Sequence, residues 1–371
     1  MEKTDIKSMD YPELSAFLTG MGEKSFRAGQ IYQWLHEKLA QSFSEMTNLS
    51  AALRERLNES CELTCLEPVE ILTSRIDGTQ KYLFRLADGN VIESVLMKYH
   101  HGNSVCISSQ AGCRMGCRFC ASTIGGLKRN LTPAELLEQV YQIRRLSGER
   151  VSNVVLMGTG EPLDNYENVK KFICMLSDER GQNISGRNIT LSTCGIVPNI
   201  YRLAKEGLQI TLALSLHASS QEKRRDLMPI ANKYSLDQVM EACRSYYDLT
   251  GRRLTFEYSL VGGVNDTVRD AQELAGLVQG MNCHINLIPV NPIEERSYVQ
   301  SDKKTILKFK NKLENYGINV TIRREMGRDV NGACGQLRRH YIEETKDTHS
   351  LQDTGQTGPI CPKGTESEEE I

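Results

Sequence analysis

The feature that most limits the possible folds of this chain is an alternation, across its middle, of short apolar runs with longer amphipathic segments. The runs are rich in β-branched residues and have the length of buried strands, whereas the segments between them are long enough for helices. They lie at residues 105–108, 151–157, 188–192, 209–216, 254–261, 283–290 and 318–323. This repetition predicts an α/β fold with a parallel sheet, specifically a partial (β/α)6-type barrel; a doubly wound flat sheet is the alternative.

The residues before this region have a different character. Leucine and aromatic residues recur with helical spacing within 11–57, and 67–98 has the pattern of three short strands separated by the turn signals Asp77-Gly78 and Asp88-Gly89. We therefore expect a helical N-terminal accessory domain over 1–65, a β extension over 66–98 and the α/β core over 99–345.

The charge of the chain is unevenly distributed. Residues 347–371 hold six acidic residues and one lysine, a net charge of −5. Since the whole chain has a net charge of −2, the rest of the chain carries +3. Its Gly-, Thr-, Pro- and Glu-rich composition predicts a disordered acidic tail over 346–371. The body has basic clusters around Arg323 and Arg324, Arg338 and Arg339, and Lys303 and Lys304. Such clusters permit binding to nucleic acid without requiring it.

The cellular compartment follows from what the sequence contains. No apolar stretch approaches the length of a membrane span, and the N-terminus lacks the apolar segment of a secretory signal, so we expect a cytoplasmic protein without membrane attachment. Thiols stay reduced in that compartment. The 12 cysteines therefore favour metal binding or catalysis over a disulfide framework.

Three of these cysteines, Cys113, Cys117 and Cys120, lie within eight residues, and no fourth cysteine or histidine is close in the sequence. Structural zinc sites and ordinary electron-transfer iron–sulfur clusters use four protein ligands, so a triplet indicates a metal centre with one position open. The alternatives are a zinc site that recruits a distant ligand, and cysteines that are simply small buried hydrophobic residues.

Polar residues and glycines follow several of the predicted strands. Parallel barrels build their sites at the carboxyl ends of strands, so these residues are expected to converge into one polar rim. The strand-end segments are Gly158-Thr159-Gly160-Glu161-Pro162, Ser192-Thr193-Cys194-Gly195, Ser215-Leu216-His217 and Pro289-Val290-Asn291.

The spacing C-x3-C-x2-C, with Phe119 before the last cysteine, resembles the signature loop of the radical S-adenosylmethionine (SAM) superfamily. The resemblance becomes more specific with the segments 108–113, Gly160-Glu161-Pro162, Leu191-Ser192-Thr193, Ser215-Leu216-His217 and Ala333-Cys334-Gly335-Gln336-Leu337. Together these motifs resemble the RlmN/Cfr family of RNA adenine methyltransferases over roughly residues 10–345. Residues 99–345 would then form a radical SAM core, and the N-terminal domain an RNA-facing module.

The resemblance implies a cofactor set and the residues that hold it. Cys113, Cys117 and Cys120 would bind three irons of one 4Fe-4S cluster, and the amino and carboxylate groups of SAM would chelate the fourth. Two SAM molecules would be used per methylation. The residues expected to line the SAM site are Gly160, Glu161, Ser192, Ser215, Leu216, His217 and Asn291.

Three further residues match positions that handle the methyl group in the family. Cys334 matches the cysteine that is methylated by one SAM and then loses hydrogen to a 5′-deoxyadenosyl radical made from the second. Cys106 matches the thiol that releases the RNA by forming a transient disulfide with the methyl carrier, and Glu93 matches the proton acceptor. Without the resemblance, the sequence pattern predicts that Cys106 is a core residue and that Glu93 is a solvent-facing residue of a strand.

Two branches of the family differ in the ring carbon that is methylated. Pro162, the strand end at Asn291 and the long approach 328–332 to Cys334 resemble the C2 branch rather than the C8 branch. The implied substrates are an adenosine in the peptidyl-transferase centre of 23S rRNA and the adenosine beside the anticodon of tRNA. A reducing electron donor such as flavodoxin or ferredoxin is implied, and nothing requires more than a monomer. The rival hypothesis is a non-enzymatic iron–sulfur or zinc RNA-binding redox sensor.

Overall fold

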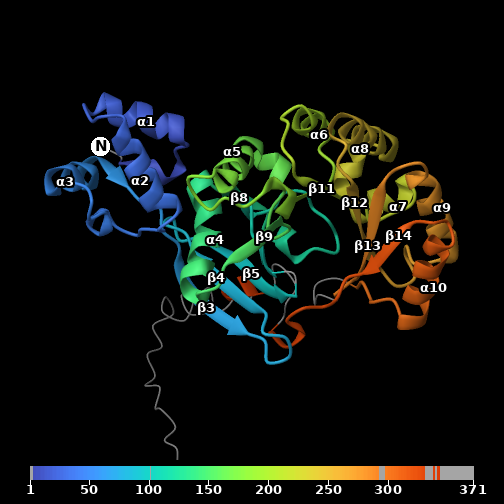
Figure 1. Ribbon diagram of the computed structural model, residues 1–371. Helices are drawn as coiled ribbons and strands as arrows, with labels where there is room; N and C mark the ends of the chain where they lie inside the picture. The colour runs from blue at the N-terminus through green and yellow to red at the C-terminus, as the bar shows by residue number, and fades with distance from the viewer. Residues whose placement is uncertain (1–2, 101, 292–296, 331–336, 339–340, 343–371) are drawn as a thin grey trace, which may run out of the picture.

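The computed structural model of the protein describes residues 3–100, 102–291, 297–330, 337–338 and 341–342. The N-terminal part is helical, as its periodicity predicts. Its elements are β1 (Thr4–Asp5), α1 (Tyr11–Gly20), α2 (Phe26–His36), α3 (Ala51–Ser60) and β2 (Cys61–Glu62). Their apolar faces, with Leu14, Ile31 and Leu57 fully or almost fully buried, form a small core separate from the main one. At the left of Figure 1 this unit stands beside the rest of the molecule.

The three strands expected within 67–98 are confirmed. They are β3 (Glu67–Thr73), β4 (Gln80–Arg85) and β5 (Val91–Tyr99), joined as antiparallel neighbours by the two predicted turns. Gly78 and Gly89 both adopt positive φ angles, the conformation for which glycine is suited in tight turns. β5 also pairs in antiparallel fashion with β6 (Gly102–Cys106), so the extension continues directly into the core sheet.

The core is a curved parallel sheet with its helices on the outside of the arc (Figure 1). Its strands after β6 are β9 (Val151–Leu156), β10 (Ile189–Thr193), β11 (Thr211–Ser215), β12 (Leu254–Leu260), β13 (Cys283–Pro289) and β14 (Asn319–Ile322). They pair in the order in which they occur in the chain. A doubly wound sheet reverses its strand order at a switch point. The partial barrel is therefore the correct expectation.

The covering helices are amphipathic, and all except α5 and α6 begin after a residue whose side chain caps the first turn. They are α4 (Pro133–Ser147), α5 (Tyr166–Ser177), α6 (Val197–Ala204), α7 (Gln221–Leu227), α8 (Leu236–Thr250), α9 (Val268–Val278) and α10 (Lys303–Glu314). At the start of α4, the Thr132 side chain accepts from the Glu135 amide, and the Glu135 carboxylate accepts from the Thr132 amide. Among the described residues, every helix is too short or too polar to cross a membrane.

The first parallel strand differs from its predicted range. It begins at Gly102 and ends at Cys106, not at residue 108; the Ile107 amide still donates to Val155 of β9 at 3.0 Å, but the backbone of Ser108 bonds to a side chain. Gln139 on α4 accepts from the Ser108 amide at 2.8 Å and donates to the Ser108 carbonyl at 2.9 Å. The chain then forms the hairpin β7 (Gln110–Gly112) and β8 (Leu127–Asn130), which holds residues 113–126 between its strands.

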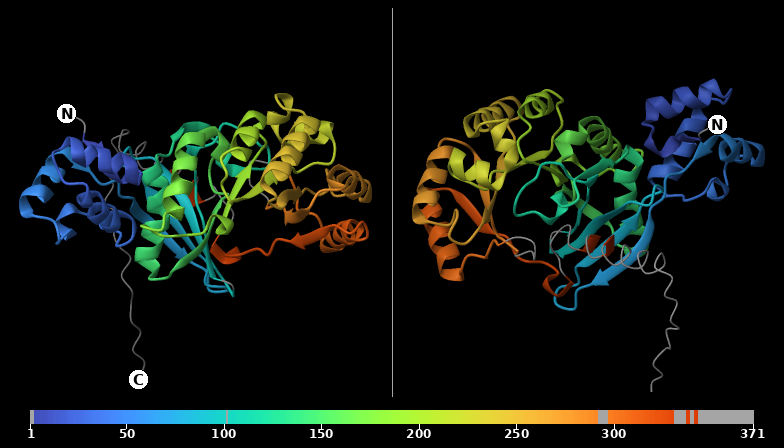
Figure 2. Two further views of the ribbon diagram at one scale, coloured as in Figure 1. Left: turned by 45° about the horizontal axis from the view of Figure 1, so that its top comes forward. Right: turned by 180° about the vertical axis from the view of Figure 1, so that it is seen from behind.

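The short described segment after residue 336 returns to the β extension. Leu337 is buried against Leu83 of β4 and Val91 of β5, far from it in sequence. Figure 2 shows this red segment beside the β4–β5 strands. Cys334 and the acidic tail lie outside the described residues.

Candidate active site

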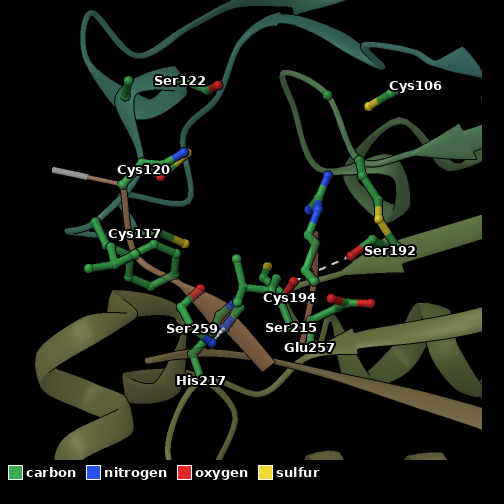
Figure 3. A pocket seen from close by; sticks show the side chains of 18 of the residues that line it. Cys106, Cys117, Cys120, Ser122, Ser192, Cys194, Ser215, His217, Glu257 and Ser259 are labelled. Carbon is green, nitrogen blue, oxygen red and sulfur yellow. Dashed lines mark hydrogen bonds between the residues drawn. The ribbon is translucent and has the colours of Figure 1, made fainter. Parts of the chain in front are cut away.

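A cavity of about 570 Å³ opens at the carboxyl ends of the parallel strands, inside the arc of the sheet. Its volume is within the range of small-molecule sites. It is lined by nine of the residues predicted from strand ends and from the cysteine triplet, together with Cys106; these lining residues are Cys113, Cys117, Cys120, Gly160, Glu161, Ser192, Ser215, His217, Asn291 and Cys106. In Figure 3, Cys106 and the pair Cys117 and Cys120 lie on opposite sides of this cavity.

The cysteine triplet occupies the loop between β7 and β8, and backbone hydrogen bonds define its shape. The Cys113 amide donates to the Gly126 carbonyl at 3.2 Å, which closes the base of the loop. The Cys120 amide donates to the Cys117 carbonyl, also at 3.2 Å, which makes a tight turn between the last two cysteines. At the outer side, the Arg114 guanidinium forms two hydrogen bonds with the Asp164 carboxylate.

The thiols of this loop are suited to binding a cationic cluster. Burial raises the pKa of the Cys113 thiol to about 12 and raises the pKa of the Cys117 thiol well above its usual range. A bound metal supplies the positive charge that lets such thiols ionise. A 4Fe-4S cluster takes each thiolate on a different iron, and all three thiols of this loop line one cavity. The three cysteines therefore fit an iron–sulfur cluster.

The Gly160-Glu161 motif connects the end of β9 to the cysteine loop. Gly160 has a φ of +113°, and a Cβ there would lie 2.7 Å from the Gln110 backbone nitrogen, so only glycine fits. The Gln110 side chain accepts from the Glu161 amide at 2.9 Å. The Glu161 carboxylate in turn accepts from the Cys194 amide at 2.7 Å and the Leu163 amide at 3.0 Å, although burial still raises its pKa.

The next strand ends supply hydroxyl and imidazole groups. The hydroxyls of Ser192 and Ser215 are 3.3 Å apart, and a dashed line in Figure 3 marks the hydrogen bond between them. His217 has a left-handed backbone, and its Nδ1 accepts from the Ser259 amide at 2.9 Å, so its ring is fixed as the neutral tautomer with hydrogen on Nε2. Burial and then the charge of Arg224 lower the pKa of His217 to about 3.

Not every residue of the predicted rim presents its side chain to the cavity. The Leu216 side chain is fully buried in the main core, and its amide donates to the Glu257 carbonyl at 3.0 Å. Leu216 can therefore contact a ligand in the cavity only through its backbone atoms. The alternation of side chains along a strand explains this result, because Ser215 and His217 point to the face opposite that of Leu216.

Cys106 and Glu93 lie on one face of the sheet. Cys106 on β6 pairs with Val95 on β5, and Val95 is two residues beyond Glu93, so the side chains of all three project to the same side. Val95 and Cys106 line the cavity, whereas Glu93 is the next position behind them. Glu93 is only 3% exposed, so its interpretation as a solvent-facing residue is wrong.

Three residues at this site were not singled out by sequence reasoning. Cys194, named in the sequence only as part of a strand-end segment, is buried and also lines the cavity. Glu257 lines the cavity from the middle of β12, where its charge within an otherwise apolar strand is a usable signal. Arg224 is fully buried and donates to the Cys194 carbonyl at 2.7 Å. No sequence signal marks it, because the basic segment 223–225 resembles a solvated helix face.

The mouth of the cavity is basic. Arg323, Arg324 and Arg328 follow β14, are exposed, and line the opening together with Glu325 and Met326. The predicted lysine cluster at 303–312 is instead on α10, whose apolar side packs against the core through Ile306, Phe309 and Leu313. Compared with the lysines of α10, the arginines after β14 are therefore better positioned to contact a polyanion that enters the cavity.

Comparisons with known proteins agree with this arrangement. Residues 4–63 match the Ribosomal RNA large subunit methyltransferase N-terminal domain, and residues 107–277 match the Radical SAM superfamily. The chain is 65% identical over 345 residues to a protein of Lachnospira eligens, covering 93% of this chain and 99% of the relative, whose name is "Probable dual-specificity RNA methyltransferase RlmN". A Lachnoclostridium phytofermentans protein of the same name is 63% identical, over 93% of this chain and 97% of its own length.

A solved structure gives the same result for the fold. A radical SAM methyltransferase from Sphaerobacter thermophilus superimposes with a TM-score of 0.86 at 42% sequence identity, covering 90% of this chain and 98% of that protein. The similarity thus extends over both the helical N-terminal unit and the sheet that carries the cavity.

Proposed function

This chain belongs to the RlmN family of radical SAM RNA methyltransferases, and from that membership we propose that it methylates C2 of adenosine. Its proposed substrates are an adenosine in the peptidyl-transferase centre of 23S rRNA and the adenosine beside the anticodon of tRNA. A cytoplasmic reductant such as flavodoxin or ferredoxin would supply the electrons.

One observation carries this proposal: the Cys106 thiol lines the same cavity as the three cysteines of the β7–β8 loop. A cluster that only transferred electrons or sensed redox state would need no additional thiol across an open cavity. A methyl transfer that passes through a protein cysteine needs one, because a second thiol must release the product. The exposed arginines at the mouth are suited to hold RNA phosphates while the target adenine enters unstacked.

Cys113, Cys117 and Cys120 would hold the 4Fe-4S cluster. Gly160, Glu161, Ser192, Ser215, His217 and Asn291 would line the SAM site beside it, with Leu216 contributing its backbone. When bound, the cluster supplies the electron that cleaves SAM into methionine and a 5′-deoxyadenosyl radical. The chain's own part is to hold the ligand in a small buried site, where Gly160 allows close approach and the hydroxyls of Ser192 and Ser215 offer hydrogen bonds to ribose or carboxylate groups.

Three other residues would handle the methyl group: Cys106, which lines the cavity, Glu93 behind it, and Cys334. Cys334 would accept a methyl group from one SAM by displacement. That methyl group would lose a hydrogen atom to the 5′-deoxyadenosyl radical, and its carbon would then add to the adenine ring. Glu93 takes the proton from the ring carbon that has been attacked. With the unpaired electron of the adduct passed back to the oxidised cluster, the Cys106 thiolate would attack the Cys334 sulfur: the S–S bond forms, the bond from sulfur to the added carbon breaks, and that carbon takes a proton to become the methyl group of the RNA.

Product analysis tests the proposal. We expect the anaerobically reconstituted, reduced protein to convert SAM to 5′-deoxyadenosine and to yield RNA whose nucleosides contain 2-methyladenosine by mass spectrometry. Cys334→Ala should abolish methylation, while Cys174→Ala, at an exposed cysteine outside the cavity, should not. Recovery of 8-methyladenosine would assign the C8 branch, and absence of any methylated adenine with the wild-type protein would refute the proposal.

Cys106→Ala tests the release step separately. This variant is expected to accumulate RNA attached covalently to the protein, visible as a slow band on a denaturing gel that disappears after nuclease digestion. Free methylated RNA in wild-type yield from Cys106→Ala would exclude Cys106 from product release.

A further inference from the structure

A lysine is buried beside the proposed base. Lys81 on β4 is completely buried, and its Nζ lies 3.4 Å from Oε2 of Glu93, which is itself 3% exposed. Lysine is among the residues least often found fully buried, because removing an ammonium group from water is costly unless a partner compensates. The position of Lys81 inside the sheet therefore requires an explanation beyond packing.

Glu93 is held from two sides. Lys81 approaches from β4, and the backbone amide of Arg338 donates to the Oε1 atom of Glu93. The Arg338 side chain is also nearly buried, and its Nε donates to the Val91 carbonyl at 2.8 Å. Lys81 and Arg338 are the charged groups that face Glu93 within the described chain, and both are cations. They compensate the cost of burying a carboxylate in its charged form.

Sheet register connects this ion pair to the cavity. Val95 pairs with Lys81 on one side and with Cys106 on the other, so Lys81, Val95 and Cys106 form a row across three strands on one face of the sheet. Neighbours in such a row are about 5 Å apart, and Glu93 is one position along the same face, about 7 Å from Val95. The Lys81–Glu93 pair therefore lies directly behind the cavity wall that Val95 and Cys106 form.

We propose that Lys81 is a positioning residue, which orients the Glu93 carboxylate beside the cavity so that Glu93 accepts the proton of adenine C2. This inference rests on the proposed function. In the step concerned, the C2–H bond breaks, its electron pair stays on the ring, and the proton forms a new O–H bond on Glu93. A carboxyl group that was already protonated could not take it. The Lys81 ammonium, 3.4 Å from Oε2, and the Arg338 amide at Oε1 fix the orientation of the Glu93 carboxylate for this step.

Single-turnover experiments distinguish this role from a purely structural one. Lys81→Met removes the charge and keeps most of the length of the side chain. We expect it to slow formation of methylated RNA about 100-fold, the lower range for loss of a general base. It should leave methylation of Cys334, measured by mass spectrometry, and the KM for RNA within about 2-fold of wild type. Lys81→Arg, which restores the charge, should recover at least about 10-fold of the lost rate.

Two further measurements connect Lys81 to Glu93. If Lys81 acts through Glu93, the double variant Lys81→Met/Glu93→Gln should be no slower than Glu93→Gln alone. With RNA deuterated at adenine C2, Lys81→Met should show a larger isotope effect than wild type, because proton removal becomes slower relative to the other steps. The matched control is Arg85→Met, which removes a cation from the same strand that is paired with Glu67 at the edge of the sheet; it should behave as wild type in every assay.

The outcomes are distinct. A wild-type rate in Lys81→Met, additive losses in the double variant, or an unchanged isotope effect would each overturn the inference while leaving the proposed function intact. Loss of Cys334 methylation in Lys81→Met without rescue by Lys81→Arg would also overturn it and assign Lys81 to the fold. Failure of the wild-type protein to methylate adenine would overturn the proposed function and this inference together.

Discussion

The ammonium group of Lys7 lies 2.8 Å from the Glu138 carboxylate, and both side chains are completely buried. The two residues come from different parts of the molecule, since Lys7 precedes α1 in the helical N-terminal unit and Glu138 is on α4 of the core. Arg145 completes the contact by donating to Glu138 at 2.6 Å and to the Leu39 carbonyl at 2.9 Å. The N-terminal unit is thus joined to the core by buried charge as well as by apolar contacts.

Removing one partner should therefore destabilise the protein strongly. We expect Lys7→Met to lower the free energy of unfolding by about 3 kcal/mol, because Glu138 keeps a buried charge with one cation fewer. Arg56→Met, which breaks the exposed pair with Glu23, is the control and should cost no more than about 1 kcal/mol. Equal losses in urea unfolding of the two variants would contradict the importance of burial.

The same interface contains a histidine that makes stability depend on pH. His36 is buried with its Nδ1 2.9 Å from the Tyr141 hydroxyl, and burial, followed by the charge of Lys7, lowers the pKa of His36 to about 3. The unfolded chain binds a proton near pH 6.5, so this residue contributes stability above that pH and loses it as the pH falls from about 6.5 towards 3. By about pH 5 the loss should reach about 2 kcal/mol.

A variant isolates this contribution from that of the carboxylates. Between neutral pH and about pH 5, the free energy of unfolding of the wild type should fall by about 2 kcal/mol more than that of His36→Gln, because the variant lacks the histidine that protonates on unfolding. Parallel pH profiles for the two proteins would show that His36 does not contribute to the acid sensitivity.

The arginines at the cavity mouth should determine how RNA binding responds to salt. Arg324→Ala is expected to weaken RNA binding and to reduce the slope of log Kd against log salt concentration by about 0.7 to 0.9, the value for one lost phosphate contact. Arg323→Ala should behave in the same way. Lys308→Ala, an exposed lysine on α10 outside the cavity, is the control. An unchanged slope in the arginine variants would exclude phosphate contacts there.

The close approach of Gly160 to Ser109 and Gln110, just before the cysteine loop, gives a prediction on stability and chemistry. Gly160→Ala would place its methyl group 2.6 Å from the Ser109 hydroxyl, at a φ of +113°. We expect a loss of about 2 kcal/mol or more in the free energy of unfolding and reduced 5′-deoxyadenosine formation. Gly89→Ala, at a φ of +82° in open space, isolates the backbone cost and should retain activity. Equal losses of stability and equal 5′-deoxyadenosine formation in the two variants would show that the contacts of Gly160 do not require glycine.

Much of the fold follows from local pattern. The period of the apolar runs identifies the strands, and the caps identify helices such as α4, because these signals depend on neighbours within a few residues. Strand ends are less certain. The predicted strand continues through residues 107–108, yet the amide and the carbonyl of Ser108 bond to the side chain of Gln139, 31 residues away. A side chain that distant cannot be inferred from the strand itself.

By itself, the sequence determined the spacing of Cys113, Cys117 and Cys120 and the alternation of strands and helices along the chain, because both depend on residues close together in the chain. Only the tertiary structure decided which charges are buried. Arg224 resembles its exposed neighbours in sequence but is enclosed beneath Cys194, and Lys81 stands in an ordinary strand yet pairs with Glu93 behind the cavity. The cost of burying a charge depends on the groups that surround it in space, and those come from strands and helices far apart in the chain.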